Sequence, residues 1–203
     1  MASVYDLKPR FQALWRPLVR CLAQVGATAN QVTVLAAILS IAVGAWLAAS
    51  RGSRAALFAV PAFLFVRMAL NAIDGMLARE HGQKSRLGAI LNEVGDVISD
   101  AALYLPFALV AGFPPIAVVV IVVLAVVSEM TGVVGLQIGA SRRYDGPMGK
   151  SDRAFVFGAL SLILALGAPA GRWLEILLWA VAALLALTIV NRARRALAEV
   201  PRP

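Results

Sequence analysis

Six apolar segments, separated by short polar connections, restrict the fold of this chain more than any other feature. Most of them run for about 20 residues, the length that an α-helix needs to cross the hydrocarbon part of a bilayer. The segments cover residues 32–49, 55–78, 87–111, 115–137, 154–166 and 173–190. We therefore predict an all-α integral membrane protein with six transmembrane helices, folded as a single membrane domain over residues 1–203.

The composition supports this class and excludes others. Hydrophobic residues make up 61% of the 203 residues and charged residues only 15%, whereas soluble domains are nearer half apolar and a quarter charged. A disordered chain and a disulfide-stapled secreted domain are excluded, and the composition argues strongly against a soluble globular protein. The single cysteine, Cys21, also rules out an intrachain disulfide.

The basic residues predict the orientation. Of the 19 lysines and arginines, 15 fall in the first 24 residues, in the second and fourth connections, or near the end of the chain. The opposite side carries Arg51, Arg54 and Arg172, and Arg67 lies inside the second segment. Lys and Arg concentrate in cytoplasmic loops, so both termini are predicted to be cytoplasmic. The same rule explains the net charge of +8 without a nucleic-acid partner.

Residues 5–24 do not form a seventh apolar segment. The apolar residues that recur there at helical spacing are Phe11, Leu14, Trp15, Leu18 and Leu22. Basic residues lie off that line, at Arg10, Arg16 and Arg20. This pattern is typical of an amphipathic helix in the cytoplasmic interface. Residues 191–203 are expected to form a cytoplasmic tail.

Ionisable residues gather on the second and third segments. Asn71 and Asp74 are three residues apart near the end of the second, so they share a helix face. A stripe with four-residue spacing begins in the third and consists of Gly88, Asn92, Asp96 and Asp100. Glu93 lies on an overlapping face. A short connection joins the two segments, so these oxygen side chains are expected to converge near the cytoplasmic surface.

Carboxylates inside a membrane are costly and indicate function. Brought together without partners they repel one another, and some take up protons. A hard divalent cation removes this conflict, because Mg²⁺ binds oxygen ligands and commonly shares its site with phosphate oxygens. A metal and a phosphate at a membrane surface favour phosphoryl transfer that involves a lipid.

This part of the chain resembles the signature of the CDP-alcohol phosphotransferase family, D-x2-D-G-x2-A-R-x8-G-x3-D-x3-D. The matching stretch reads Asn71-x2-Asp74-Gly75-x2-Ala78-Arg79-x8-Gly88-x3-Asn92-x3-Asp96. All spacings agree, and both departures replace Asp by Asn. Six spans and an amphipathic helix before them extend the resemblance over most of the chain.

The resemblance implies a reaction in which CDP-diacylglycerol gives its phosphatidyl group to an alcohol acceptor and CMP is released. The implied cofactor is Mg²⁺ or Mn²⁺, as one or two ions, and the implied general base is Asp96. The implied metal ligands are Asn71, Asp74, Asn92 and Asp96. The implied donor-binding residues are Asp74, Gly75, Ala78, Arg79 and Gly88. A homodimer in a bacterial inner membrane is also implied.

The two asparagines leave several alternatives open. Asp74 and Asp96 supply two negative charges where the family has four, although Asn still offers a neutral carbonyl oxygen. Glu93 and Asp100 are close enough in the sequence to restore the charge. The site therefore holds one metal ion, or holds two through relocated ligands, or has lost activity.

A second basic cluster lies between the fourth and fifth segments. It resembles the part of family members that carries acceptor-binding basic residues, which here are Lys150, Arg153, Arg142 and Arg143. Such residues can bind a phosphate on the acceptor through charge-assisted hydrogen bonds. The alternative is ordinary positive charge on the cytoplasmic side.

Two other functions are compatible with this sequence. An inactive family member that acts as a membrane scaffold would explain the asparagines, and an ion- or proton-coupled transporter would use intramembrane carboxylates as a path. Arg67 and Glu129 have two interpretations, because polar side chains can simply join helices. Arg67 can instead neutralise a carboxylate of the site, since it shares the face of Asn71 and Asp74.

Overall fold

The computed structural model describes residues 4–200, with side chains from residue 11 onward, and within this range it contains helices and no strand. The α-helices are α1 (Val4–Gln24), α2 (Ala29–Ala49), α3 (Arg54–Glu80), α4 (Arg86–Tyr104), α5 (Pro115–Val134), α6 (Lys150–Ala165) and α7 (Arg172–Glu199). Two short 3₁₀ helices follow α4 and α5, η1 (Leu105–Leu109) and η2 (Gly135–Ile138).

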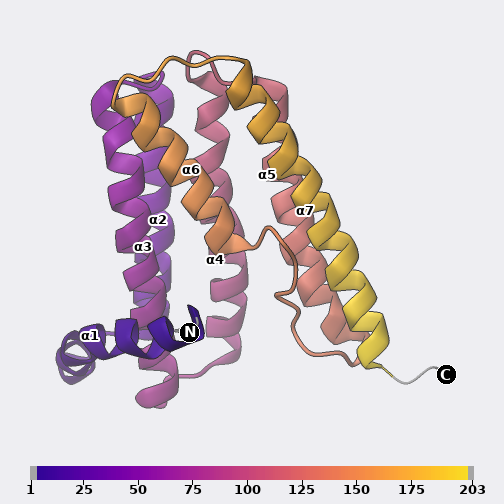
Figure 1. Ribbon diagram of the computed structural model, residues 1–203. Coiled ribbons are helices and arrows are strands. Elements are labelled where there is room, and N and C mark those ends of the chain that lie inside the picture. Colours follow the sequence, from indigo (N-terminus) through magenta and orange to yellow (C-terminus); the bar gives the residue numbers. More distant parts are fainter. Residues whose placement is uncertain (1–3, 201–203) are drawn as a thin grey trace.

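Helices α2 to α7 form an elongated bundle, and α1 lies across one end of it (Figure 1). The end of α7 is at that same end of the bundle (Figure 1). The ring of Phe11 contacts Phe65 of α3 with centroids 6.2 Å apart, and Arg16 pairs with Glu80 at 3.0 Å. The helix predicted over 5–24 is therefore present, while its place in a lipid interface stays a prediction. Arg10 lies outside the described side chains.

Four elements are long and apolar enough to cross a membrane: α2, α3, α5 with η2, and α7. Helix α4 carries three acidic residues and α6 has only 16 residues, so these two helices do not meet the same standard of length and composition. Both nevertheless run alongside the others in the bundle (Figure 1). Four candidate spans are therefore established, and the count of six stays a prediction.

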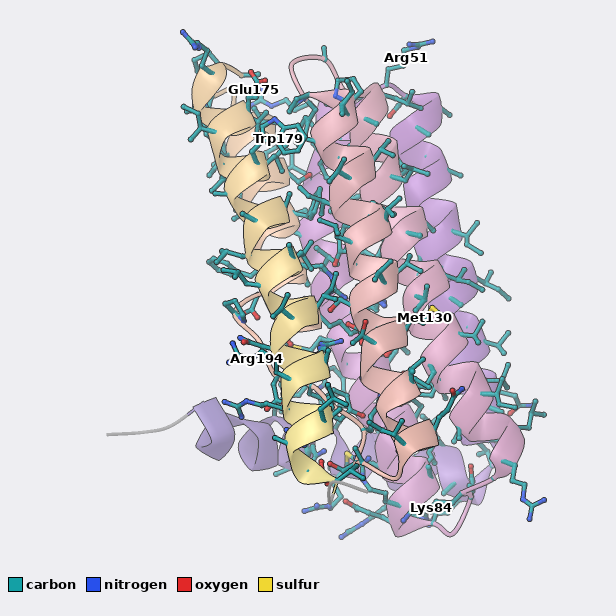
Figure 2. The ribbon with its side chains drawn as sticks, turned by 90° about the vertical axis from the view of Figure 1, so that its right-hand side faces the viewer. Arg51, Lys84, Met130, Glu175, Trp179 and Arg194 are labelled. Atoms are coloured by element: carbon teal, nitrogen blue, oxygen red, sulfur yellow. The ribbon has the colours of Figure 1, made fainter. Side chains whose placement is uncertain are left out.

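The outer surface of the bundle is apolar. Met130 projects away from the helices about midway along the bundle, and Arg51 and Lys84 mark its opposite ends (Figure 2). Large apolar side chains such as Ile116, Met130 and Ile176 are more than 60% exposed. A soluble protein rarely exposes so much contiguous apolar surface, which supports an integral membrane protein.

Two predicted segments have different ends in the structure. The segment 87–111 is not one helix, because α4 ends at Tyr104 and continues as η1. Pro106 lacks the N–H that an α-helix would need there. Helix α7 extends to Glu199, so most of the predicted tail 191–203 is helical, and residues 201–203 lie outside the described range.

The packing around α2 shapes the bundle. Helices α3 and α4 both pack on α2 rather than on each other, α6 packs on α3, and α5 packs on α7 and α4. Gly44 permits the close approach of α2 and α4, because a Cβ there would lie 1.9 Å from the carbonyl oxygen of Ala102. Helices α3 and α4, which carry the predicted site, therefore both lie against α2.

Candidate active site

A cavity of about 520 Å³ opens at the end of the bundle that α1 crosses. Its volume is in the range of small-molecule sites. Helices α2, α3 and α4 line it together with η2 and the connection from α5 to α6. The predicted site residues in its wall are Asp74, Gly75, Ala78, Arg79, Gly88, Asn92, Glu93 and Arg142. Lys84, labelled near the lower end in Figure 2, also lines it.

Asp74 is a buried carboxylate in the cavity wall, with 5% of its surface exposed. The hydroxyl of Thr33 on α2 donates a 2.8 Å hydrogen bond to its Oδ2. Within the described part of the chain, no Lys or Arg lies within 4.0 Å of Asp74, whereas the other cavity carboxylate, Glu93, is paired with Arg142. Asp74 therefore keeps its negative charge available to a ligand.

Two glycines keep the cavity open. A Cβ at Gly88 would lie 2.8 Å from Oδ1 of Asn30, a cavity-lining residue of α2. A Cβ at Gly75 would lie 2.8 Å from the guanidinium group of Arg79. At both positions a polar side chain therefore lies close to the glycine backbone, and all four residues line the cavity.

Asp96 lies outside the cavity wall and beside two cations. The ammonium group of Lys150 contacts Oδ1 of Asp96, and Nη2 of Arg67 lies 3.5 Å from the same oxygen. Arg67 also donates a 3.2 Å hydrogen bond to the backbone oxygen of Asp96. Asn71 lies half-buried on α3, one turn before Asp74.

A buried ion network continues from Arg67 into the bundle. Asp100 is bonded to Arg67 at 2.6 Å and to Arg153 at 2.8 Å, and all three side chains are at most 7% exposed. Arg153 also contacts Glu129 of α5 at 3.1 Å. Glu129 in turn receives Arg142 at 2.8 Å and Arg192 of α7 at 3.3 Å. The network therefore links five helices, α3 to α7, through charged side chains.

Arg142 connects this network to the cavity. Its guanidinium group donates two hydrogen bonds, of 3.0 and 2.9 Å, to the carboxylate of Glu93 on α4. It also lies over the ring of Tyr144, 4.6 Å from the centroid, and both residues line the cavity. The connection from α5 to α6 is thus held against α4, where it forms one side of the cavity.

The predicted acceptor-binding residues do not form one cluster. Arg142 reaches the cavity and Lys150 reaches Asp96, whereas Arg153 is fully buried between Asp100 and Glu129. Arg143 points to the opposite side of the connection, where it pairs with Asp145 and Glu199. Asp100, considered above as an extra metal ligand, is likewise enclosed by two arginines rather than by the cavity.

The connection between α5 and α6 is also tied to the end of α7. Ser141 donates two hydrogen bonds to Glu199, and these bonds hold the pKa of that carboxyl below its ordinary value. Partial burial alone would raise the pKa of Asp145, but hydrogen bonds and charge from Arg143 and Arg195 lower it overall. The segment that carries Arg142 is therefore fixed on two sides.

The oxygen groups of Asp74, Asn71 and Asn92 are the candidates to hold a divalent cation. Among the side chains that the structure describes, no three acidic, histidine or cysteine residues are arranged to hold a metal ion. Asp74 still offers an unpaired carboxylate, and Asn92 in the cavity wall and Asn71 on α3 carry neutral carbonyl oxygens. Hard cations accept both kinds of oxygen, so this set fits one such ion.

Several cavity residues were not predicted. Asn30 and Thr33 both lie on α2, whose sequence contains no charge to mark it as part of a site. Their three-residue spacing places both on one helix face, which was the available signal. The role of Arg67 as partner of a site carboxylate was one of its two interpretations, and its contacts with Asp96 and Asp100 support that one.

Comparisons with known proteins fit this architecture. A family model described as CDP-alcohol phosphatidyltransferase matches residues 27–190. The chain is 44% identical over 197 residues to the inner membrane protein YnbA of Escherichia coli (strain K12), which covers 96% of each chain. It is 35% identical over 94 residues to the phosphatidylinositol phosphate synthase of Mycobacterium tuberculosis (strain ATCC 25618 / H37Rv), covering 46% of this chain and 42% of that one.

Solved structures of the Mycobacterium tuberculosis phosphatidylinositol phosphate synthase have the same fold. The form with CDP-DAG bound superposes with a TM-score of 0.76 at 25% identity, covering 92% of this chain and 96% of that chain. The form in complex with manganese and citrate gives the same TM-score and identity, covering 92% of each chain.

The chain belongs to the CDP-alcohol phosphatidyltransferase family. The enzyme class predicted from the sequence, a CDP-alcohol phosphotransferase, is thereby confirmed.

Proposed function

We propose that this enzyme transfers the phosphatidyl group of CDP-diacylglycerol to an alcohol acceptor and releases CMP, with a divalent metal ion as cofactor. The observation that carries the proposal is the cavity itself, because its wall gathers Asp74, Gly75, Ala78, Arg79, Gly88 and Asn92 from α3 and α4. The relative solved with CDP-DAG bound supports the choice of donor.

The cavity suits a ligand with a polar head and lipid tails. It lies at one end of a bundle whose sides expose apolar residues, so a head group can enter it while acyl chains stay beside the helices. Arg79, Lys84 and Arg142 supply positive charge in its wall. Charge-assisted hydrogen bonds from such groups bind phosphate oxygens strongly.

The reaction needs a base and a leaving group. The acceptor oxygen forms a bond to the phosphorus of the phosphatidyl group while the bond from that phosphorus to the oxygen of CMP breaks, and CMP leaves with the electron pair. In this scheme the hydroxyl proton passes to the carboxylate of Asp96, which lies beside the cations Lys150 and Arg67. The nearest approach of both cations is to Oδ1, which leaves Oδ2 to accept the proton.

The metal would be held by Asp74 with the carbonyl oxygens of Asn71 and Asn92. When bound, a divalent ion neutralises negative charge on the phosphates during transfer. The relative solved with manganese supports a divalent ion. Glu93 and Asp100 would not serve as ligands in this scheme, because arginines already occupy them.

The end of the bundle that carries the cavity is proposed to face the cytoplasm of a bacterium, in its inner membrane. Of the 15 basic residues assigned to that side, Arg153 and Arg192 are buried in the ion network rather than free in loops. The remainder still far exceeds the three on the other side, so the positive-inside rule gives the same orientation. The implied homodimer stays a prediction.

The test is release of CMP by the purified chain in detergent, with CDP-diacylglycerol, Mg²⁺ or Mn²⁺, and a panel of alcohols with and without phosphate. We expect metal-dependent release with one class of acceptor. Asp96→Asn should abolish it, whereas Glu175→Gln, an exposed change at the far end of the bundle, should not. A folded protein that neither binds CDP-diacylglycerol nor releases CMP would contradict the proposal and favour the scaffold alternative.

A further inference from the structure

The carboxylates around the cavity differ in one respect, namely whether a cation of the protein already neutralises them. Four of them are paired: Glu93, Asp96, Asp100 and Glu129. Their partners are five cations, Arg67, Arg142, Lys150, Arg153 and Arg192. Among the described residues of this region, Asp74 alone has no Lys or Arg within 4.0 Å.

The position of Lys150 is the informative one. It begins α6, and its ammonium group contacts Oδ1 of Asp96, and neither residue lines the cavity. Asp152 bonds the backbone N–H of Gly149 and so fixes the start of this helix. Lys150 is therefore delivered to Asp96 by a capped helix end and by the adjacent buried contacts of Arg153, rather than by a free loop.

A protein cation at Asp96 has a consequence for metal binding. An ion beside Asp96 would meet the positive charges of Lys150 and Arg67 at short range, and such repulsion is strong where water is excluded. No replacement ligands are at hand, because Glu93 and Asp100 are held by arginines. Asp74 differs from Asp96, because no Lys or Arg of the described residues pairs with it within 4.0 Å, and Asn92 lines the same cavity with a neutral amide group.

We infer that this enzyme binds one divalent cation per chain, at Asp74, and that the ammonium group of Lys150 takes the place of a second metal ion at Asp96. The inference rests on the proposed function only for the existence of a metal requirement. It selects one of the three alternatives that the sequence left open. It also explains why asparagine stands at positions 71 and 92, because fewer carboxylates are needed where the protein itself supplies a positive charge.

The experiment counts bound ions directly. The full chain is purified in detergent, freed of metal with EDTA, and titrated with Mn²⁺ while free Mn²⁺ is followed by electron paramagnetic resonance. We expect one Mn²⁺ per chain in the wild type and none at the same concentrations in Asp74→Asn. Lys150→Met should bind a second Mn²⁺, and the two neighbouring ions should broaden each other's signal.

Two control variants separate this effect from a general change of charge. Lys150→Arg keeps a cation at Asp96 and should still bind one ion. Lys84→Met removes a positive charge from the cavity rim without freeing a carboxylate, so it should also bind one. Near-wild-type unfolding temperatures verify that the variants are folded. If Lys150→Met does not fold, Lys150→Gln, which also removes the cation, carries the test and should bind the second ion.

Two ions in the wild type, a second ion in Lys150→Arg or Lys84→Met, or an unchanged count in folded Lys150→Met would each overturn the inference. Absence of any bound ion in the wild type would overturn it as well. Failure of the proposed transferase is a separate outcome, because it would show as absent CMP release in a chain that still binds one Mn²⁺.

Discussion

The hydroxyl of Thr33 on α2 and the carboxylate of Asp74 on α3 are joined by a 2.8 Å hydrogen bond. This is the shorter of the two contacts of that hydroxyl, the other being to the backbone oxygen of Ala29 at 3.0 Å. A helix without a charged residue thereby orients the one site carboxylate that lacks a cationic partner.

Replacing Thr33 by Val keeps the shape of the side chain and removes this bond. Loss of a hydrogen bond that orients a metal ligand typically weakens metal affinity by roughly 10–100-fold, so we expect a change of that order in Mn²⁺ binding. Thr131→Val is the matched control, because its hydroxyl bonds only within α5. Equal Mn²⁺ affinities in the two variants would contradict a positioning role for Thr33.

Asp100→Asn should destabilise the folded protein. The change removes the negative charge that Arg67 and Arg153 share, and it leaves both guanidinium groups buried without full compensation. Breaking a buried ion pair costs about 3–5 kcal/mol. Thermal unfolding in detergent measures the effect against Glu175→Gln, which is expected to be close to wild type. A loss no larger than that of the control would mean that the network adds no stability.

Gly88→Ala should weaken donor binding more than Gly95→Ala, a substitution on the same helix. The new methyl group at position 88 would lie 2.8 Å from Oδ1 of Asn30 and would displace that side chain into the cavity. At position 95 the nearest atom is a methyl carbon of Thr33 at 3.6 Å, which is ordinary contact. We expect the KM for CDP-diacylglycerol to rise roughly tenfold in the first variant only, equivalent to about 1.4 kcal/mol.

The ties between the α5–α6 connection and α7 should respond to acid. The pKa of Asp145 is lowered below its ordinary value of 3.8 in the folded protein, so this carboxylate stabilises the fold at pH values above 3.8. That contribution is lost as the pH falls through the lowered pKa. Asp145→Asn should therefore reduce the unfolding temperature at pH 7, and this effect should become smaller as the pH falls below 3.8. A difference in unfolding temperature that does not decrease on acidification below pH 3.8 would contradict this origin.

Much of the fold was determined by the sequence, because a helix that crosses a membrane must consist of apolar residues over a length fixed by the bilayer. The segments at 32–49 and 55–78 correspond closely to α2 and α3. The end of α4 at Tyr104 was harder to predict from the sequence. The 3₁₀ turn after it depends on Pro106 and on the packing of Phe107 and Tyr104 against Phe157.

The sequence also predicted part of the site, namely which residues share a helix face. Spacings of four residues place Asp74 with Ala78, Gly75 with Arg79, and Gly88 with Asn92 on faces that local helix geometry fixes. Those residues line one cavity. The same spacings could not tell which carboxylates meet a cation, because they fix a side chain on its own helix and do not show which residues of other helices face it.

Only the tertiary structure decided those partnerships. Asp100 meets Arg153, 53 positions later in the sequence, and Glu129 meets Arg192, because the rotation and approach of α4, α5, α6 and α7 place them together. Helix rotation depends on packing across the whole bundle, including the contact at Gly44. The sequence by itself therefore determined the helices, the enzyme family and the local faces of the site. The choice of which charges remain available to a ligand depended on how the helices pack.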